Sequence, residues 1–324
     1  MTTAGQRTGS AAARDEDADP EPTALDVLRG YLSAQSSAFL AQLPRLREGK
    51  PEASHKIRVA CRRSRSMLRT YRPLLDGEWA DALAAQIAEF TEVVGPERDV
   101  EVVRDRLLTA LDALADDASG AMRARTLLER MLQRDYAVAH ETTLAALAGP
   151  KFHALADRIA LAPETLPGLP EADGTAREAL YPLVARAFEV AERRVNALPD
   201  PRKQSAQAAL ADEATDELWH RVRIAAKRCR YAAEVCLPVA GASASTLARE
   251  MTIITEELGS QQDAAVASAV LLRAARTPRI AAPTGFVLGR LLGESRAGIL
   301  RSRIAFPSLW TKAADPELRA WLQQ

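Results

Sequence analysis

The 324-residue sequence is poor in cysteine and aromatic residues and has no excess charge of either sign. Its three cysteines, Cys61, Cys229 and Cys236, lack CxxC spacing, so we expect reduced thiols rather than a disulfide framework. A formal net charge of zero gives the whole chain no bias toward nucleic acid or membranes. Neither a signal peptide nor a run of eighteen apolar residues occurs, which predicts a cytoplasmic protein without a membrane span.

Residues that favour helices are abundant instead. Hydrophobic residues make up 47% of the chain and aromatics only 5%, while Ala, Leu, Arg and Glu recur throughout. Helical periodicity dominates and no alternating strand pattern is found, so we predict an all-α fold. Helices should begin near Leu25, Pro51, Glu78, Glu97, Gly120, Gly174, Arg202, Ser243, Gln261 and Pro283.

The composition also predicts how the chain is divided. Residues 1–22 are small, polar and rich in acid, which is typical of a disordered tail. Residues 163–173 are rich in proline and should link two helical halves, at 23–162 and 174–310. Residues 311–324 would then form a C-terminal extension.

One basic segment occurs twice. His55–Arg65 reads HKIRVACRRSR and His220–Arg230 reads HRVRIAAKRCR. Pro73 and Pro238 each lie eighteen residues after the leading histidine, and each should end its helix. We therefore predict a duplicated helical bundle.

The correspondence continues past the basic segments. Gly95 and Gly259 follow at matching distances, and each pattern predicts a helix that ends at glycine before a tight turn. Asp99 and Asp263 are acids at matching positions in both halves, each four residues after the glycine. We expect these carboxylates to cap the turn or to pair with a basic residue of the repeat.

At about 100° per residue, the cations of each copy fall on one helix face and the apolar residues on the other. No acid lies between Glu52 and Asp76 or between Glu217 and Glu234. Like charges one helical turn apart repel, so such a face needs internal carboxylates or an external polyanion against it. The candidate residues on these faces and their flanks are His55, Lys56, Arg58, Arg62, Arg63, Arg65, Arg69, His220, Arg221, Arg223, Lys227, Arg228 and Arg230.

The paired HxxRxxxKRxR-like segments, with the LGxxxD-type turns after them, resemble the CHAD family, the conserved histidine α-helical domain, over about residues 22–310. The resemblance implies two repeated antiparallel, four-helix-bundle-like halves with pseudo-twofold symmetry and a basic groove between them. It also implies binding of inorganic polyphosphate, no catalysis, no cofactor and, for some relatives, residence on polyphosphate granules. The binding role falls on the candidate residues above, except that Arg69 rests on helix geometry alone. Glu234 stands in its place in the second copy, which suggests a longer site on the first half's side.

Polyphosphate suits such a face because guanidinium groups engage two phosphate oxygens at once. We expect affinity to fall steeply with salt and to rise as pH drops through the histidine range. A thin phosphate chain fits between close helices where a duplex does not, and Tyr71 and Tyr231 are too few to stack single-stranded bases.

Four other functions are open to the sequence. A metal site is disfavoured because HxxxH and CxxC pairs are missing and the surrounding cations repel a metal ion. A phosphoryl-accepting histidine protein and a hydrolase or hydrolase accessory remain alternatives, although ExExK, the signature of the CYTH triphosphatase domain of many relatives, does not occur. Specific nucleic-acid binding lacks a reader motif. His140 and His153 lie outside the repeat and are expected to be ordinary bundle residues.

Overall fold

Every regular element of the computed structural model is a helix within residues 21–50, 52–114, 118–200 and 213–323, which are the residues it describes. The all-α prediction is therefore confirmed. The predicted tail falls outside these ranges up to residue 20, as does the helix start expected near Arg202. The elements are α1 (Ala24–Arg47), α2 (Ala53–Thr70), η1 (Arg72–Leu74), α3 (Gly77–Asp112), α4 (Ala118–Ala148), α5 (Pro150–Leu161), η2 (Pro170–Ala172), α6 (Ala176–Asn196), α8 (Glu213–Val235), α9 (Leu237–Ala275), α10 (Ala282–Ala313) and η3 (Pro316–Gln323).

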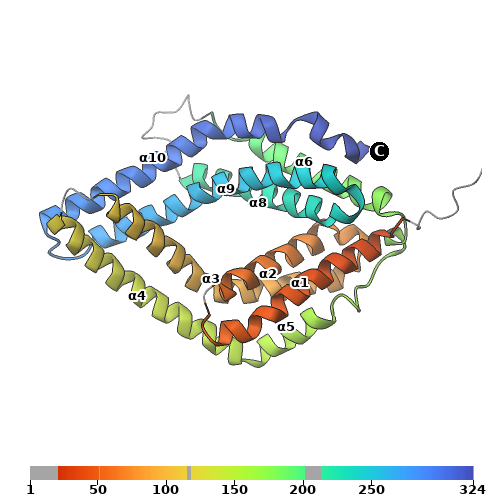
Figure 1. Ribbon diagram of the computed structural model, residues 1–324, viewed down its shortest axis with the longest axis horizontal. Helices are drawn as coiled ribbons and strands as arrows, with labels where there is room; N and C mark the ends of the chain where they lie inside the picture. The colour runs from red at the N-terminus through yellow and green to blue at the C-terminus, as the bar shows by residue number, and fades with distance from the viewer. Residues whose placement is uncertain (1–20, 51, 115–117, 201–212, 324) are drawn as a thin grey trace, which may run out of the picture.

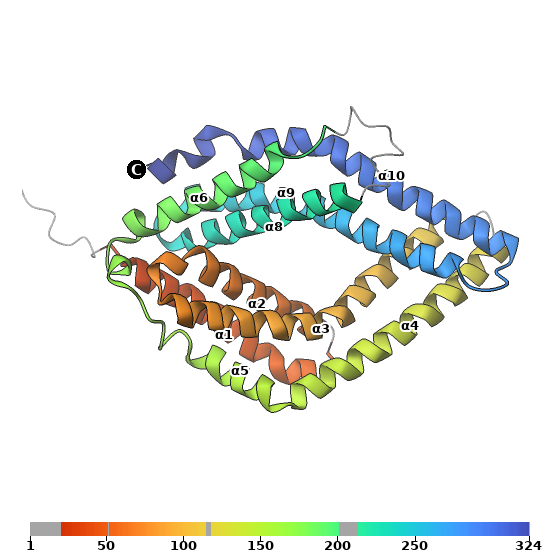
Figure 2. The same cartoon turned by 180° about the vertical axis from the view of Figure 1, so that it is seen from behind.

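The helices form an elongated molecule (Figures 1 and 2). The longest ones, α3, α4, α9 and α10, converge at one tip, while the start of α1 and the C-terminal residues lie toward the other end. The two basic helices, α2 and α8, contact each other near the middle. None of the described helices combines the length and hydrophobicity that crossing a membrane requires.

The buried side chains form two clusters, and neither divides at the proline-rich segment. The larger cluster joins α1, α2, α5, α6, α8 and parts of α3, α9 and α10. The smaller one fills the tip with residues such as Leu107 of α3, Leu128 of α4, Leu271 of α9 and Leu288 of α10. Each cluster thus draws on both predicted halves. The domain boundaries and the pseudo-twofold relation between the halves stay predictions.

The long helices correct several expected boundaries. Gly95 lies inside α3 and Gly259 lies inside α9, so the prediction that helices end at these glycines, and that new ones start near Glu97 and Gln261, was wrong. The helices continue because each contributes to both clusters: α3, for example, buries Val94 in the larger and Leu107 in the smaller. Packing at both ends overrides the local preference of glycine and proline to break a helix.

The helix starts near Leu25, Pro51, Glu78, Gly120, Gly174 and Pro283 agree with the structure to within a few residues. Pro73 lies in η1 just after α2 ends, and Pro238 lies in the first turn of α9 just after α8 ends, as predicted. The start expected near Ser243 was misplaced, because α9 begins at Leu237. Its backbone bends at Gly241, whose φ of 48° suits glycine, before the regular helix resumes.

The proline-rich segment is hydrogen-bonded to the connection between α2 and α3 and packs against α1. The Leu169 amide donates to the Leu74 carbonyl at 3.0 Å, and the Asp76 amide donates to the Pro167 carbonyl at 2.9 Å. A Cβ on Gly168 would lie only 2.8 Å from a methyl group of Leu25. Just before this segment comes α5, a helix whose start the sequence pattern did not indicate.

Tyr71 ties α2 to α8 and provides a test of this packing. Its buried hydroxyl donates to the Ala232 carbonyl at 2.9 Å. Tyr71→Phe is expected to lower the free energy of unfolding by about 1 kcal/mol, because one buried hydrogen bond is lost. Urea denaturation followed by circular dichroism would measure the change.

Tyr31→Phe is the matched control, because the Tyr31 hydroxyl is buried without a hydrogen-bond partner. Its removal should leave the unfolding free energy unchanged or slightly higher. Equal losses in the two variants would contradict the assignment of the stabilising contact to Tyr71.

Candidate anion-binding site

A pocket of about 810 Å³ opens between α2, α3, α8 and α9. Eight arginine and lysine side chains line it, together with both histidines of the repeat, but only three carboxylates do. The pocket is therefore strongly cationic inside a chain whose net charge is zero. Its charged and histidine residues are His55, Arg58, Arg62, Arg63, Arg98, Asp99, Arg106, His220, Arg223, Lys227, Arg230, Glu256 and Asp263.

The structure brings together most, but not all, of the candidates chosen from sequence. The pocket takes His55, Arg58, Arg62, Arg63, His220, Arg223, Lys227 and Arg230. The remaining candidates, which lie outside its lining, are Lys56, Arg65, Arg69, Arg221 and Arg228. Of these, Lys56 faces Glu52 at 3.7 Å and Arg221 pairs with Glu217 at 2.9 Å on the exposed sides of their helices. The binding role of each candidate stays a prediction.

The apolar faces of α2 and α8 fix the direction of the cations. The residues that α2 buries include Ile57, Ala60, Cys61, Met67 and Leu68, and α8 buries Val222, Ala225, Ala226 and Cys229. The predicted two-faced helices are thus confirmed. Burial raises the pKa of the Cys61 and Cys229 thiols to about 12, so both stay uncharged and act as small apolar residues.

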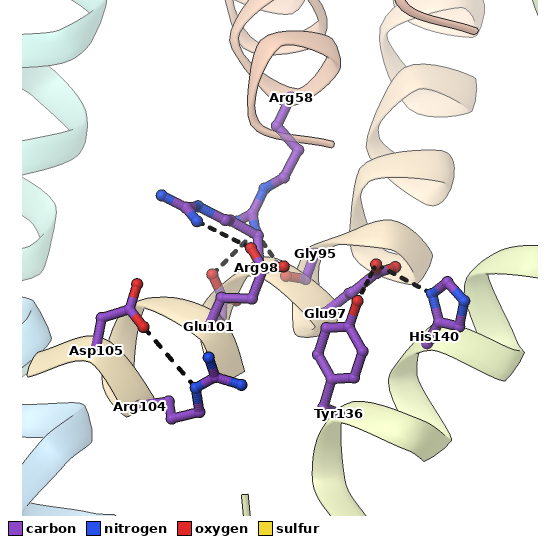
Figure 3. A network of polar contacts seen from close by, with 10 residues as sticks. Arg58, Gly95, Glu97, Arg98, Glu101, Arg104, Asp105, Tyr136 and His140 are labelled. Carbon is purple, nitrogen blue, oxygen red and sulfur yellow. Dashed lines mark hydrogen bonds and ion pairs between the residues drawn. The ribbon is translucent and has the colours of Figure 1, made fainter. Parts of the chain in front are cut away.

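Arg58 and Arg223 lie against the neighbouring helices at Gly95 of α3 and Gly259 of α9. Figure 3 shows Arg58 reaching from α2 to α3, where it donates to the Gly95 carbonyl at 2.6 Å and to Asp99 at 2.9 Å. Arg223 reaches from α8 toward α9, and its guanidinium lies 3.3 Å from the point where a Cβ on Gly259 would be. The close approach of Arg223 therefore favours glycine at position 259, whereas a Cβ on Gly95 would lie 3.7 Å from Arg58, an ordinary van der Waals distance. Neither glycine ends a helix.

Glu234 neutralises a second part of the cationic surface. Its carboxylate lies 3.1 Å from Arg63 of α2 and 2.8 Å from Arg230 of its own helix. Its side chain is only 12% exposed, so the contacts are poorly screened by solvent. With Asp99, internal carboxylates thus account for Arg58, Arg63 and Arg230.

Three cations at the pocket have no such partner. Within the described part of the chain, no carboxylate lies within 4.0 Å of Arg62, Arg223 or Lys227. The Nε atoms of Arg62 and Arg223 are buried and donate no hydrogen bond. Buried donors are normally satisfied, so these two groups stand out as donors that an acceptor placed in the pocket would satisfy.

Burial and the closeness of other cations lower the pKa values of several basic groups in the pocket. Burial, with the charges of Arg223 and Arg62, lowers the pKa of Lys227 to about 7. Burial likewise lowers the pKa of Arg62 and Arg223 below the ordinary arginine value. The pKa of His55 is lowered by burial and by Arg62. Every one of these shifts disfavours the positive charge of the group.

Sequence reasoning missed two arginines of the pocket. Arg98 and Arg106 both come from α3, eight residues apart, with the pocket residue Val102 between them. This spacing places the three on one helix face, but the sequence pattern does not show that this face is turned toward the basic helices.

Glu97 points away from the pocket and joins α3 to α4 (Figure 3). It accepts from the Tyr136 hydroxyl at 3.3 Å and lies 3.1 Å from Nδ1 of His140. His153 contacts the Gly149 carbonyl on α5. Both histidines thus lie outside the pocket, and no group of three metal-ligating side chains gathers anywhere in the described ranges.

The pattern of the CHAD domain matches residues 30–272, so the chain belongs to the CHAD domain family. Over 273 residues it is 29% identical to "Uncharacterized protein Rv2226" of Mycobacterium tuberculosis, covering 84% of this chain and about half of that relative's length. Among solved structures, "PptA from Streptomyces chartreusis" superposes with a TM-score of 0.75 at 32% identity, over 90% of this chain and 99% of that one. The CHAD domain of the plant Ricinus communis gives a TM-score of 0.60 at 22% identity over 97% of both chains, which supports the fold.

The buried charge of Lys227 should weaken folding in a pH-dependent way. An unfolded lysine has a pKa of about 10.4, whereas that of folded Lys227 is about 7. Between these values the unfolded chain binds more protons, so the contribution of Lys227 to stability rises with pH across that window. Lys227→Met is expected to raise the melting temperature at pH 6, with a gain that shrinks toward pH 9.5. Equal gains at both pH values, or a loss at pH 6, would contradict this account.

Proposed function

We propose that this protein binds inorganic polyphosphate in the cationic pocket and leaves the polymer chemically unchanged. The observation that carries the proposal is the group formed by Arg62, Arg223 and Lys227, three half-buried cations without carboxylate partners at one pocket. An anion placed among them would satisfy buried donors and offset the burial and the repulsion that lower their pKa values.

The chemistry of the pocket favours linked phosphates over other anions. Arginines from α2, α3 and α8 present forked pairs of N–H donors that match phosphate oxygens. The pocket offers Tyr231 as its single aromatic side chain, and Arg230 already lies over that ring at 5.6 Å. A nucleic acid would therefore find charge but no platform on which to stack its bases. Membership of the CHAD family agrees with a polymer that has phosphates and no bases.

The positions of the acids support binding without turnover. Phosphoryl transfer normally uses carboxylates to hold Mg²⁺ and to orient water. Asp99 is occupied by Arg58 at 2.9 Å, and cations outnumber carboxylates around the pocket. A divalent metal ion would be repelled there.

The central test replaces two of the unpaired cations and measures affinity at several salt concentrations. Arg62→Gln combined with Arg223→Gln is expected to weaken binding of long-chain polyphosphate by at least about a hundredfold, since each charge-assisted hydrogen bond contributes about 1.5–3 kcal/mol. The slope of log K against log salt should also become about 2 units shallower, because two phosphate contacts are lost. Isothermal titration calorimetry would supply both quantities.

The control is Arg123→Gln, an exposed change near the beginning of α4, which does not line the pocket. It should leave affinity and slope close to those of the unmodified protein. Unchanged affinity in a folded double variant would refute the pocket as the site, and a salt-independent affinity would refute the mechanism. Polyphosphate recovered after incubation with the protein should keep its original length.

Residence in the cytoplasm on polyphosphate granules belongs to the same proposal, because a protein that binds the stored polymer should collect where it is stored. Fluorescence microscopy of a tagged copy in polyphosphate-rich cells is expected to show discrete foci. Diffuse signal in those cells would rule out granule association but not binding in vitro.

A further inference from the structure

The two basic helices differ at one position that bears on how far the anion site extends. When the repeated segments are aligned, Arg69 of α2 corresponds to Glu234 of α8. The neighbours of Glu234 have counterparts as well: Arg63 aligns with Arg228, and Arg230 aligns with Arg65. One group therefore contains a carboxylate between two arginines, while its counterpart contains three arginines.

The first group is complete within the protein. Glu234 contacts Arg63 at 3.1 Å and Arg230 at 2.8 Å, and both arginines line the pocket. An anionic oxygen pair held between guanidinium groups is the arrangement that a bound phosphate would make. Between Arg63 and Arg230, the place for an anion is thus taken by the protein's own Glu234 carboxylate.

The second group, which we name the Arg69 cluster, consists of Arg65, Arg69 and Arg228. Within the described part of the chain, none of the three has a carboxylate within 4.0 Å. Arg69 is exposed and the other two are half-buried. Burial and the nearby charge of Arg69 lower the pKa of both Arg65 and Arg228, so the three groups lie close enough to repel.

The acids around the Arg69 cluster do not neutralise it. Asp81 is near Arg69, but it forms its ion pair with Arg72 at 2.8 Å. Glu92 is near Arg65 without contact at ion-pair distance. The cluster thus keeps a surplus of positive charge that its counterpart at Glu234 lacks.

We propose that the Arg69 cluster is a second anion site, which holds the phosphates of a polymer that extends beyond the pocket, while Glu234 fills the corresponding position beside Arg63 and Arg230. This inference rests on the proposed function and gives it a direction. Arg65 follows Arg62 of the pocket by three residues, a rise of about 4.5 Å along α2. A chain that fills the pocket can continue along α2 toward Arg69, whereas the carboxylate of Glu234 repels it beside Arg63 and Arg230.

Two ligands distinguish the pocket from its extension. Tripolyphosphate is short enough to be held by the pocket alone, whereas long-chain polyphosphate reaches the Arg69 cluster as well. Arg69→Glu recreates the arrangement found around Glu234. It is expected to weaken long-chain binding about tenfold and to make its salt slope about 1 unit shallower, while tripolyphosphate affinity changes less than twofold. Titration calorimetry at one pH and several salt concentrations would measure both ligands.

Arg69→Glu should also raise the melting temperature of the free protein, because the new carboxylate can pair with Arg65 and Arg228 as Glu234 pairs with its own arginines. Higher stability together with weaker long-chain binding is a combination that a purely structural role of Arg69 would not give. Arg123→Glu changes the charge equally at an exposed site on α4 and should alter neither ligand's affinity beyond twofold.

The outcomes separate this inference from the function it rests on. A loss of long-chain affinity no larger than that of Arg123→Glu would refute the extension and leave the pocket standing. Equal losses for both ligands would also refute it, because Arg69 would then act through the general field. If the unmodified protein binds neither ligand, the proposed function fails and the extension fails with it.

Discussion

Repulsion among buried positive charges is the constraint on which the site depends. Arg62 from α2 and Arg223 and Lys227 from α8 share one pocket, and no described carboxylate lies within ion-pair distance of them. Such an arrangement opposes folding, as the lowered pKa of Lys227 shows. It persists because the two apolar clusters of the long helices stabilise the frame that holds the charges together. An anion bound among these three cations would replace their mutual repulsion with attraction to a common partner.

The positions of the charges depend on helices that continue through residues where the sequence suggests a helix end. Because α3 and α9 run on through Gly95 and Gly259, they form continuous walls beside α2 and α8. Arg58 lies against α3 at Gly95, and Arg223 approaches α9 closely at Gly259, where a Cβ would be only 3.3 Å away. Where an internal carboxylate is present, as at Glu234, it takes the role of the ligand and limits the site. Specificity in this account comes from which arginines the protein neutralises itself.

The sequence predicted the helical class and the two basic faces, because apolar and cationic residues at helical spacing can satisfy burial and solvation in only one way. It placed helix ends at Gly95 and Gly259 wrongly, since local breakers are outweighed by packing at both ends of a long helix. The pairing of Arg63 with Glu234 joins residues far apart in the chain, so no local pattern could indicate it. Arg98 and Arg106 were missed because the local pattern does not show that their face of α3 is turned toward α2 and α8. Lys56 and Arg221 carried the right charge but sit on the exposed sides of their helices, where Glu52 and Glu217 face them.

A crystal structure of the protein with tripolyphosphate tests the central claim most directly. The account predicts phosphate oxygens within hydrogen-bond distance of Arg62, Arg223 and Lys227 at the same time, so that one ligand bridges α2 and α8. Phosphates found only on outer helix surfaces, with Arg62 and Arg223 still lacking an acceptor, would contradict it.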